Sequence, residues 1–232
     1  SGEFVAHVAH ELKTPLNILS MYSETLLGDT SADDTLRVEA ANVIHDEVER
    51  LAIMISNMLS ISKIETGSLT IDRQRVRLHD LLQDAFDACA RAGKEKDIRF
   101  SIDMPKEISP VALDKSLMRV AINNLLTNAI KYSDPGGQVS MTVEETDTTV
   151  RVAVRDNGVG ISPEDQEKIF DKFFRSESDA VRQRTGHGLG LPLAREIIQL
   201  HHGTLKVNSA PGEGSEFMVE FNKETNLLKK AV

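Results

Sequence analysis

Apolar residues in the first part of the chain recur at intervals that alternate between four and three. This spacing places them in one stripe along a helix, which is the pattern of a coiled coil or a helical bundle. Such a helix needs other helices to cover its stripe. We therefore expect a long helix from Phe4 to Leu27 that packs into a bundle, and the residues of its stripe are Val5, Ala9, Leu12, Leu16, Leu19 and Leu26.

A second helix with the same spacing follows. The polar segment Gly28 to Ser31 interrupts the first pattern, and Ser31 or Asp33 can cap a new helix that ends near Gly67. Two long helices joined by a short turn form an antiparallel hairpin. Each stripe is too wide for one partner helix to cover, so we expect two copies of the chain to pair into a dimeric four-helix bundle. The second stripe consists of Ile44, Val48, Leu51, Ile55, Met58 and Ser62.

The remainder of the chain mixes strand and helix signals. Composition changes near residues 67 to 76, so we place a hairpin domain at 1–67, a linker at 68–75 and a second domain at 76–232. Strict alternation of apolar residues predicts strands, and a spacing of three or four predicts helices. The order of these signals predicts an α+β domain. The expected strands are 69–77, 98–102, 139–145, 150–155, 205–207 and 216–221; the expected longer helices are 81–92, 114–132 and 191–201, with a charged helix after the turn at 156–161.

The overall composition excludes several classes of protein. Of the 232 residues, 40% are hydrophobic and 27% are charged, which is typical of a soluble globular chain with packed cores. The net charge of -9 argues against non-specific nucleic-acid binding, which needs clustered lysine and arginine. The single cysteine, Cys89, excludes an internal disulfide framework. No run of 18 or more apolar residues is present, so we expect a cytoplasmic fragment.

Two histidines lie one turn apart on the first helix. His7 and His10 could bind a metal ion together with Glu11, but the pattern His-Glu-x-x-Thr lacks the second histidine of a zinc protease motif. His10 falls beside the apolar stripe, where a second domain can reach its ring, while Glu11 and Thr14 are expected farther round toward solvent. If His10 is a chemical group and not part of the packing, the rest of the chain should supply something for it to react with. His7 is expected to be an exposed spectator.

Two motifs of the second domain have the residue types of a nucleotide site, although each has an ordinary explanation. Asn124, Asn128, Lys131 and Tyr132 share one face of a predicted helix. Carboxamide oxygens can ligate Mg²⁺ and a lysine can meet a phosphate, but the same face could simply be solvated. The segment Asp156 to Ile161 offers a carboxylate for an exocyclic amine such as that of adenine, and glycines that let the backbone approach a ligand. A plain turn at the end of a strand would look the same.

Two further motifs follow in the sequence. Residues 169 to 175 place three aromatic side chains and Arg175 before a polar stretch, although the aromatics could belong to an ordinary core. Residues 186 to 191 are rich in glycine and open the last predicted helix. The exposed N–H groups and the positive end of the helix dipole at such a point form a phosphate cradle. This motif is neither a P-loop nor a dinucleotide-binding fingerprint, because no Gly-Lys-Ser/Thr follows and no strand leads directly into it.

The order and spacing of these motifs resemble one family. Residues 4 to 222 are similar to the catalytic core of bacterial two-component sensor histidine kinases. The resemblance implies a dimerisation and histidine phosphotransfer hairpin of the HisKA type, followed by an α+β two-layer sandwich of the GHKL ATPase type. The matching motifs are the phosphoacceptor motif at 10–15, the N box at 124–132, the G1 box at 156–161, the F box at 170–175 and the G2 box at 186–190.

The resemblance also implies an activity and roles for individual residues. His10 would be the nucleophile: Glu11 would accept the proton from one ring nitrogen, and the lone pair of the other would attack phosphorus in ATP. The phosphoryl group would then pass to an aspartate of a response regulator, and Thr14 would orient water in a phosphatase reaction on that regulator. Asn128 would hold Mg²⁺, and Arg175 would meet the charge that develops on the γ-phosphate. The other nucleotide-binding residues would be Asn124, Lys131, Tyr132, Asp156, Gly158, Gly160, Ile161, Lys172, Gly186, Gly188, Leu189 and Gly190.

Two positions depart from the family pattern, and two other functions stay open. Thr185 stands where glycine is common, and His187 stands where threonine or serine is common. We expect His187 to make ATP affinity depend on pH around neutrality. The alternatives are a GHKL ATPase that forms no phosphoprotein and a degenerate kinase that serves as a dimeric binding scaffold. The expected partners are a second copy of the chain and a response regulator, and we expect the parent protein to be anchored in the inner membrane through a sensor region outside this sequence.

Overall fold

The computed structural model describes residues 2–28, 33–182, 184 and 186–223. The chain divides into two compact units, residues 1–62 and 63–232. The first is helical and the second combines helices with a sheet. We describe each unit by itself.

The first unit consists of the predicted pair of long helices. Helix α1 spans Gly2–Gly28 and continues through Pro15, and α2 spans Asp34–Glu65 and so runs to the start of the second unit. The predicted helical hairpin is confirmed. The expected cap at Ser31 lies outside the described residues, whereas the carbonyl of Asp33 accepts a hydrogen bond from the N–H of Arg37 at the start of α2.

The predicted stripe of α1 is mostly exposed. Val5 and Leu16 are 66% and 53% exposed, and Ile55 and Leu59 of α2 are 45% and 57% exposed. Leu12 and Leu19 of the predicted stripe are half-buried, and the other less exposed positions of α1 keep the expected spacing one residue toward the N-terminus. Glu11 is therefore half-buried, and its predicted position toward solvent is wrong. The half-buried positions on this displaced stripe are Phe4, Val8, Glu11, Pro15, Ile18, Tyr22 and Thr25.

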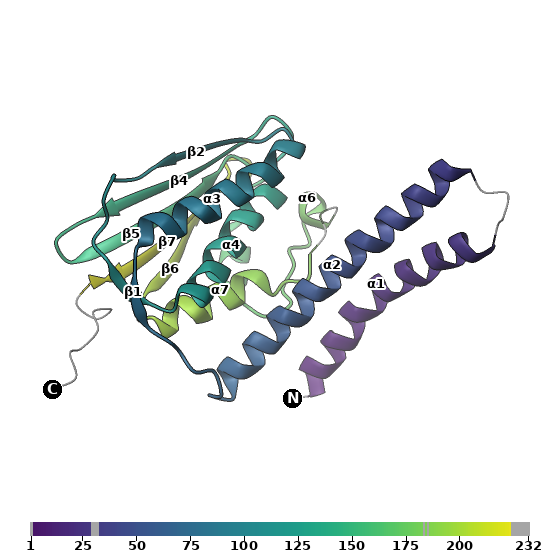
Figure 1. Ribbon diagram of the computed structural model, residues 1–232, viewed down its shortest axis with the longest axis horizontal. Coiled ribbons are helices and arrows are strands. Elements are labelled where there is room, and N and C mark those ends of the chain that lie inside the picture. Colours follow the sequence, from purple (N-terminus) through teal and green to yellow (C-terminus); the bar gives the residue numbers. More distant parts are fainter. Residues whose placement is uncertain (1, 29–32, 183, 185, 224–232) are drawn as a thin grey trace. The chain divides into compact units, whose positions relative to one another are not determined.

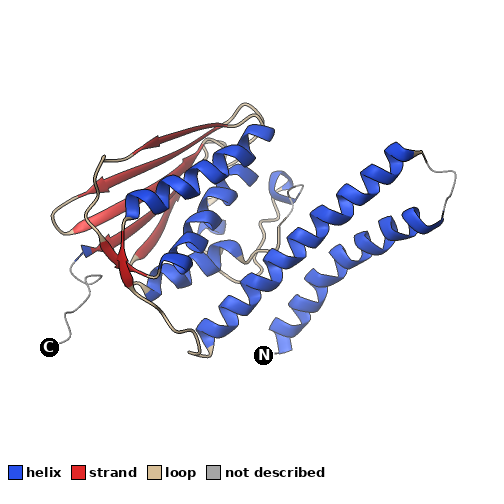
Figure 2. Ribbon diagram, viewed as in Figure 1, coloured by secondary structure: helices blue, strands red, loops and turns tan. Residues whose placement is uncertain are grey.

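The second unit is built on a five-stranded sheet in the order β2-β4-β5-β7-β6 (Figure 2). Strand β2 runs parallel to β4, and the other neighbours are antiparallel. Two short strands, β1 and β3, form a separate antiparallel ribbon. The bounds are β1 Gln74–Val76, β2 Arg99–Asp103, β3 Val111–Leu113, β4 Gln138–Glu145, β5 Thr149–Asp156, β6 Thr204–Ser209 and β7 Ser215–Asn222.

Three helices cover one face of this sheet (Figure 1). They are α3 (Leu78–Glu95), α4 (Lys115–Lys131) and α7 (Gly190–Leu200). Alternate residues of the central strands point into this layer, so Met141, Val152 and Phe217 are buried, whereas Thr142 and Arg151 on the other face are exposed. The predicted two-layer α+β sandwich is confirmed.

Three short elements differ from the expectation. The predicted charged helix is only α5 (Pro163–Gln166), capped by the hydroxyl of Ser162. Strand β3 and helix α6 (Asp179–Arg182) were not predicted. Strand β3 is only three residues long, all of them buried, so its sequence shows no alternation.

His201, at the C-cap of α7, is fully buried and hydrogen-bonded through both ring nitrogens. Nε2 accepts a bond of 3.0 Å from the N–H of Asp114, and Nδ1 lies 2.7 Å from the carbonyl of Ile197. This arrangement requires a neutral ring with its proton on Nδ1. Burial lowers the pKa of His201. The assignment of His201 to a structural role therefore fits its surroundings.

We expect acidification to destabilise the fold through His201. In the unfolded chain the ring of His201 takes up a proton near its ordinary pKa of 6.5, whereas in the folded protein its pKa is lower. The contribution of neutral His201 to the free energy of unfolding is therefore complete above about pH 6.5 and is lost as the pH falls below that value. In urea titrations between about pH 7.5 and about pH 5.5, His201→Gln should flatten the pH dependence by up to about 1.4 kcal/mol per pH unit. The exposed His45 is the control, and His45→Gln should keep the wild-type slope. Equal slopes in wild type and His201→Gln would contradict this.

Candidate active site

One face of α4 carries the amide and lysine side chains of the predicted N box. Asn124, Asn128 and Lys131 lie one turn apart on this helix, and Tyr132 forms its C-cap. The half-buried carboxamide of Asn128 makes no hydrogen bond to any described residue. Its oxygen is therefore available to ligate a hard cation such as Mg²⁺.

Lys131 joins the N box to the G2 box. Its ammonium occupies the space that a β-carbon at Gly186 would take, and it lies 5.0 Å from the ring centroid of Tyr132. No carboxylate of the described residues forms an ion pair with Lys131. Burial, reinforced by the nearby charge of Arg175, lowers the pKa of Lys131 to about 8. A buried cation with no anionic partner fits a phosphate group.

His187 and Arg175 belong to the same cluster. Burial and the charges of Lys131 and Arg175 lower the pKa of His187 to about 4. Its Nδ1 accepts a hydrogen bond of 3.2 Å from the N–H of Leu189, as a neutral ring can. The burial and the surrounding positive charge thus both oppose protonation of His187. The expectation that His187 makes ATP affinity depend on pH around neutrality stays a prediction.

Helix α7 begins at Gly190 with an uncapped N-terminus. The residue at its N-cap, Leu189, is fully buried and has no side-chain group that could accept a hydrogen bond from the first turn. The carboxamide oxygen of Asn124 lies 3.1 Å from where a β-carbon at Gly190 would be, so the N box and this helix start are in contact. The unsatisfied N–H groups and the helix dipole favour an anion here. Leu189 itself can contact a ligand only through its backbone.

The G1 box turns directly after β5. Asp156 is 4% exposed, and one of its carboxylate oxygens accepts a hydrogen bond of 2.9 Å from the N–H of Gly158. Burial raises the pKa of Asp156. A β-carbon at Gly158 would collide with the carbonyl of Tyr132, and one at Gly160 would collide with that of Ala210. Both glycines are thus required by close backbone packing.

The last residue of the G1 box fixes the turn to the sheet. The N–H of Ile161 donates a hydrogen bond of 2.8 Å to the hydroxyl of Ser209, at the end of β6. Its side chain is half-buried. The G1 box is therefore held from both sides before any ligand binds.

The F box packs against the G2 box through its backbone. Phe173 has a positive φ of 65°, and its N–H donates a hydrogen bond of 2.9 Å to the carbonyl of Gly188. Lys172, expected at the nucleotide, instead forms an ion pair with Glu65. Arg175 turns toward the following loop and donates a hydrogen bond to the carbonyl of Val181 at 3.2 Å, while its Nε is buried without a partner. An anion bound at this cluster would satisfy that buried donor.

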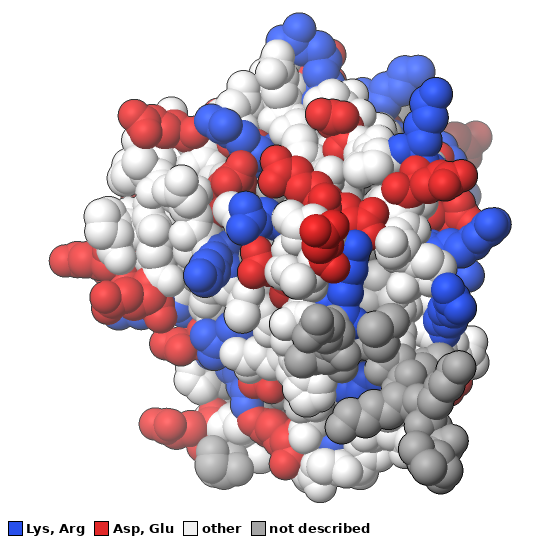
Figure 3. All heavy atoms as spheres, turned by 90° about the vertical axis from the view of Figure 1, so that its left-hand side faces the viewer, with Lys and Arg blue, Asp and Glu red and all other residues white. Residues whose placement is uncertain are grey.

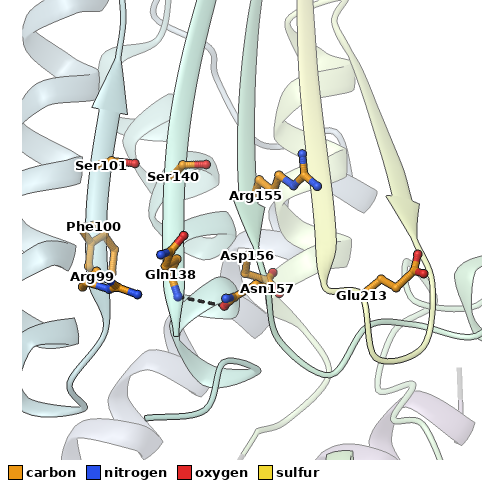
Figure 4. Close-up of a pocket in the computed structure, with 9 residues that line it drawn as sticks. All are labelled: Arg99, Phe100, Ser101, Gln138, Ser140, Arg155, Asp156, Asn157 and Glu213. Carbon is orange, nitrogen blue, oxygen red and sulfur yellow. Dashed lines mark hydrogen bonds between the residues drawn. The ribbon is translucent and has the colours of Figure 1, made fainter. Parts of the chain in front are cut away.

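A separate hollow lies on the face of the sheet that no helix covers. It has a volume of about 340 Å³ and is lined by Asp156 and Asn157 of the G1 box but by no residue of the N box or the G2 box (Figure 4). On the side of the unit shown in Figure 3, basic and acidic side chains are interspersed and neither sign dominates. Lys131 and Arg175 therefore form a local concentration of positive charge in a chain with a net charge of -9.

The candidate nucleophile lies on the first unit. The side chain of His10 is 82% exposed, and its Nδ1 lies 3.9 Å from Oε1 of Glu11, whose side chain is 28% exposed. Thr14 is exposed one turn further along α1. The predicted exposure of His10 is confirmed, and its ring can be approached from solvent.

Comparison with known protein families gives two matches in sequence order. Residues 1–67 match the family described as "His Kinase A (phospho-acceptor) domain". Residues 113–225 match the family described as "Histidine kinase-, DNA gyrase B-, and HSP90-like ATPase". The chain belongs to the sensor histidine kinases.

Sensor histidine kinases are also its relatives by sequence and by structure. The chain is 34% identical to SenX3 of Mycobacterium tuberculosis over 93% of its own length and 52% of the relative, and 33% identical to WalK of Bacillus subtilis over 92% and 35%. It thus spans about half the length of SenX3. The solved complex of histidine kinase ThkA with response regulator protein TrrA has a TM-score of 0.77 and 26% identity, covering 97% of this chain and 62% of that one. None of the described helices is long and apolar enough to span a bilayer.

Two cations of this histidine kinase core were not predicted as site residues. Arg184 donates hydrogen bonds to the carbonyls of Lys131 and Ser133 at 2.7 and 2.9 Å, and its other nitrogen bonds to Asp134 at 2.6 Å. Lys96 donates to the carbonyls of Ile130 and Lys131 at 2.9 and 3.2 Å. Both stabilise the C-terminal end of α4, where the helix dipole favours positive charge. Neither carries a local sequence signal, because each is far from α4 along the chain.

We expect the affinity of the site for ADP to fall as the pH rises from about 7 to about 9.5. Without nucleotide Lys131 loses its proton near its pKa of about 8, whereas a bound phosphate would hold that proton. The contribution of the Lys131 ammonium to ADP affinity is complete below this pKa. Above it, the affinity decreases by up to about tenfold per pH unit. Calorimetric titration with ADP measures the change. Lys131→Arg keeps its charge throughout and should give a flat profile, so parallel profiles for the two proteins would contradict the prediction.

Proposed function

We propose that this chain transfers the γ-phosphoryl group of ATP to His10. The observation that carries the proposal is the half-buried cluster of Lys131, Arg175 and His187 beside the uncapped start of α7, in which no carboxylate of the described residues pairs with either cation. This cluster suits a polyphosphate, and the same chain presents an exposed histidine with a neighbouring carboxylate. Family membership supports the combination of the two.

The residues around the cluster suit the parts of a magnesium nucleotide. Lys131, the glycines at 186, 188 and 190 and the N–H groups of α7 would bind the phosphates, with Asn124 beside them. Asn128 would ligate Mg²⁺ through its carboxamide oxygen, and the ion would neutralise phosphate charge when bound. The carboxylate of Asp156 would accept a hydrogen bond from the adenine amine, with Tyr132 lining the same site. Among the described residues no group of His, Cys, Asp and Glu forms a metal cluster of its own, which agrees with a metal held by Asn128 and the phosphates.

The chemistry at His10 follows from the position of Glu11. Nδ1 faces this carboxylate, which favours the ring form with the proton on Nδ1 and the lone pair on Nε2. Nε2 would form the bond to phosphorus while the bond between phosphorus and the bridging oxygen breaks, and ADP would leave. The Nδ1 proton would pass to Glu11, so that the phosphorylated ring does not retain a positive charge. Arg175 would turn from the loop carbonyls toward the transferring group.

Labelled nucleotides test this proposal directly. Incubation with ATP labelled at the γ-phosphate should label the protein, and ATP labelled at the α-phosphate should not. Release of labelled inorganic phosphate with no labelled protein would instead identify an ATPase. Nucleotide binding with neither outcome would identify a degenerate kinase.

We further propose that the chain forms a homodimer through α1 and α2 and passes its phosphoryl group to a response regulator. Among the described residues, the large apolar side chains that are exposed to solvent all lie on these two helices, apart from Val120. A four-helix bundle of two hairpins would cover them. The complex of ThkA with TrrA supports a response regulator as the partner. Thr14 would orient the water that hydrolyses the phosphorylated regulator in a phosphatase reaction. Sedimentation equilibrium tests the dimer, and a monomer under the assay conditions would contradict it.

A further inference from the structure

The carboxylate of Asp114 binds two backbone segments at once. Its Oδ1 accepts a hydrogen bond of 3.1 Å from the N–H of Leu117, which caps the start of α4. Its Oδ2 accepts a bond of 3.0 Å from the N–H of Asp72, in the segment that follows α2 along the chain. Capping α4 requires only the first of these bonds. The second fastens the connecting segment to the helix that carries the N box.

The C-terminal end of α7 also forms hydrogen bonds to Asp114 and to the connecting segment. The N–H of Asp114 donates to Nε2 of His201, and the guanidinium of Arg73 donates a hydrogen bond of 2.6 Å to the carbonyl of Leu200. Beside these contacts, β1 pairs with β3 in the register Gln74 to Leu113. Two successive residues of the connecting segment are therefore bonded to the start of α4 and to the end of α7.

We propose that Arg73, Asp114 and His201 form a junction that positions α4 and α7, so that displacement of the connecting segment changes nucleotide affinity. The proposal rests on the proposed function, in which these two helices hold the nucleotide. None of the three residues touches the nucleotide site; they are positioning residues. The junction therefore gives the segment after the hairpin a route to regulate the site.

The physical argument is that the junction and the site lie at opposite ends of the same rigid elements. Asn124 lies about 15 Å along α4 from Asp114 at 1.5 Å per residue. The uncapped start of α7 is likewise the end remote from His201. The two helices pack against one another. A shift of α4 and α7 at the junction must therefore move their other ends at the nucleotide site, unless the hydrogen bonds at His201 break. Those bonds are costly to break because His201 is buried and water cannot replace them.

Two substitutions separate positioning from simple stabilisation. Asp114→Ser keeps a hydroxyl that can cap α4 but removes the second acceptor, which held Asp72. Arg73→Ala removes the bond to Leu200 from a half-buried side chain, so we expect the protein to fold. Each should raise the dissociation constant of ADP about threefold to tenfold, and Arg73→Lys should restore much of the affinity because it keeps a cationic donor. Arg155→Ala, which changes the uncovered face of the sheet, is the matched control and should bind ADP as wild type does.

Coupling is reciprocal, so the nucleotide must also act on the junction. In hydrogen exchange measured by NMR on the full chain, ADP should slow exchange at the N–H groups of Asp72 and Asp114 in wild type and less so in Arg73→Ala. Wild-type ADP affinity in both variants, with a loss only of thermal stability, would overturn the proposal. A wild-type chain that binds ADP but is never phosphorylated would overturn the proposed function. The junction would still be tested by the ADP affinities of the variants. A chain that binds no ADP would overturn both.

Discussion

His10→Gln should abolish labelling of the protein by the γ-phosphate of ATP, a fall of at least about a thousandfold, as loss of a catalytic nucleophile produces. The carboxamide of glutamine is a poor nucleophile, so it cannot form the bond to phosphorus. The nucleotide site is in the other unit and should be unchanged, so ADP affinity should stay at the wild-type value. Labelling by γ-phosphate and calorimetric titration with ADP measure the two quantities on the same preparation.

The matched control for this change is His7→Gln. His7 lies one turn before His10 on the same helix and is also exposed, so the two substitutions make equal changes to the helix. His7→Gln should be labelled at the wild-type rate. Labelling that survives in His10→Gln, or that is lost in both variants, would contradict the assignment of the nucleophile.

Gly188→Ala should lower nucleotide affinity by at least about thirtyfold, which is ~2 kcal/mol. Gly188 has a φ of +70°, and a β-carbon there would lie 2.7 Å from the carbonyl carbon of Phe173 and 2.8 Å from the carbonyl oxygen of Phe174. These contacts are with backbone, which cannot move aside as a flexible side chain could. The F box and the G2 box would have to separate, and the phosphate-binding N–H groups would move with them. Calorimetric titration with ADP measures the loss.

Backbone strain alone does not explain the expected loss of affinity in Gly188→Ala. Gly136→Ala measures the effect of backbone strain without a close contact. Gly136 also has a positive φ, of +84°, but a β-carbon there would have no atom within 4 Å. Its substitution should lower stability by about 1 kcal/mol and change nucleotide affinity by less than about threefold. Equal losses of affinity in Gly136→Ala and Gly188→Ala would show that the close contact with the F box has no part in binding.

The architecture, and the shared helix face of several candidate site residues, could be predicted because their signals are local. The heptad spacing defines α1 and α2, and the alternation of Val150 to Val154 defines a central strand without knowledge of its neighbours. The spacing of Asn124, Asn128 and Lys131 places them on one helix face whatever the rest of the fold. In each case a few consecutive residues determine the conformation.

The features that could not be predicted depend on residues distant in the sequence. The lowered pKa of His187 follows from its burial and from the charges of Lys131 and Arg175, which reach it from α4 and the F box. The half-buried face of α1 includes Glu11, which is one residue before Leu12 of the expected stripe. Apolar periodicity predicts the spacing of the residues on a buried face, but it does not fix which neighbouring residues complete that face. Strand β3 contributes only three residues, too few for a pattern.

The chemical stability of the phosphorylated protein tests the central claim most directly. A phosphoryl group on a ring nitrogen of His10 is expected to be released by acid and to survive base, whereas a phosphate ester of serine or threonine survives acid. Protein labelled from the γ-phosphate of ATP should therefore lose its label in mild acid and keep it in mild alkali. Label that survives acid, or ATP hydrolysis that leaves no label on the protein, would contradict the account.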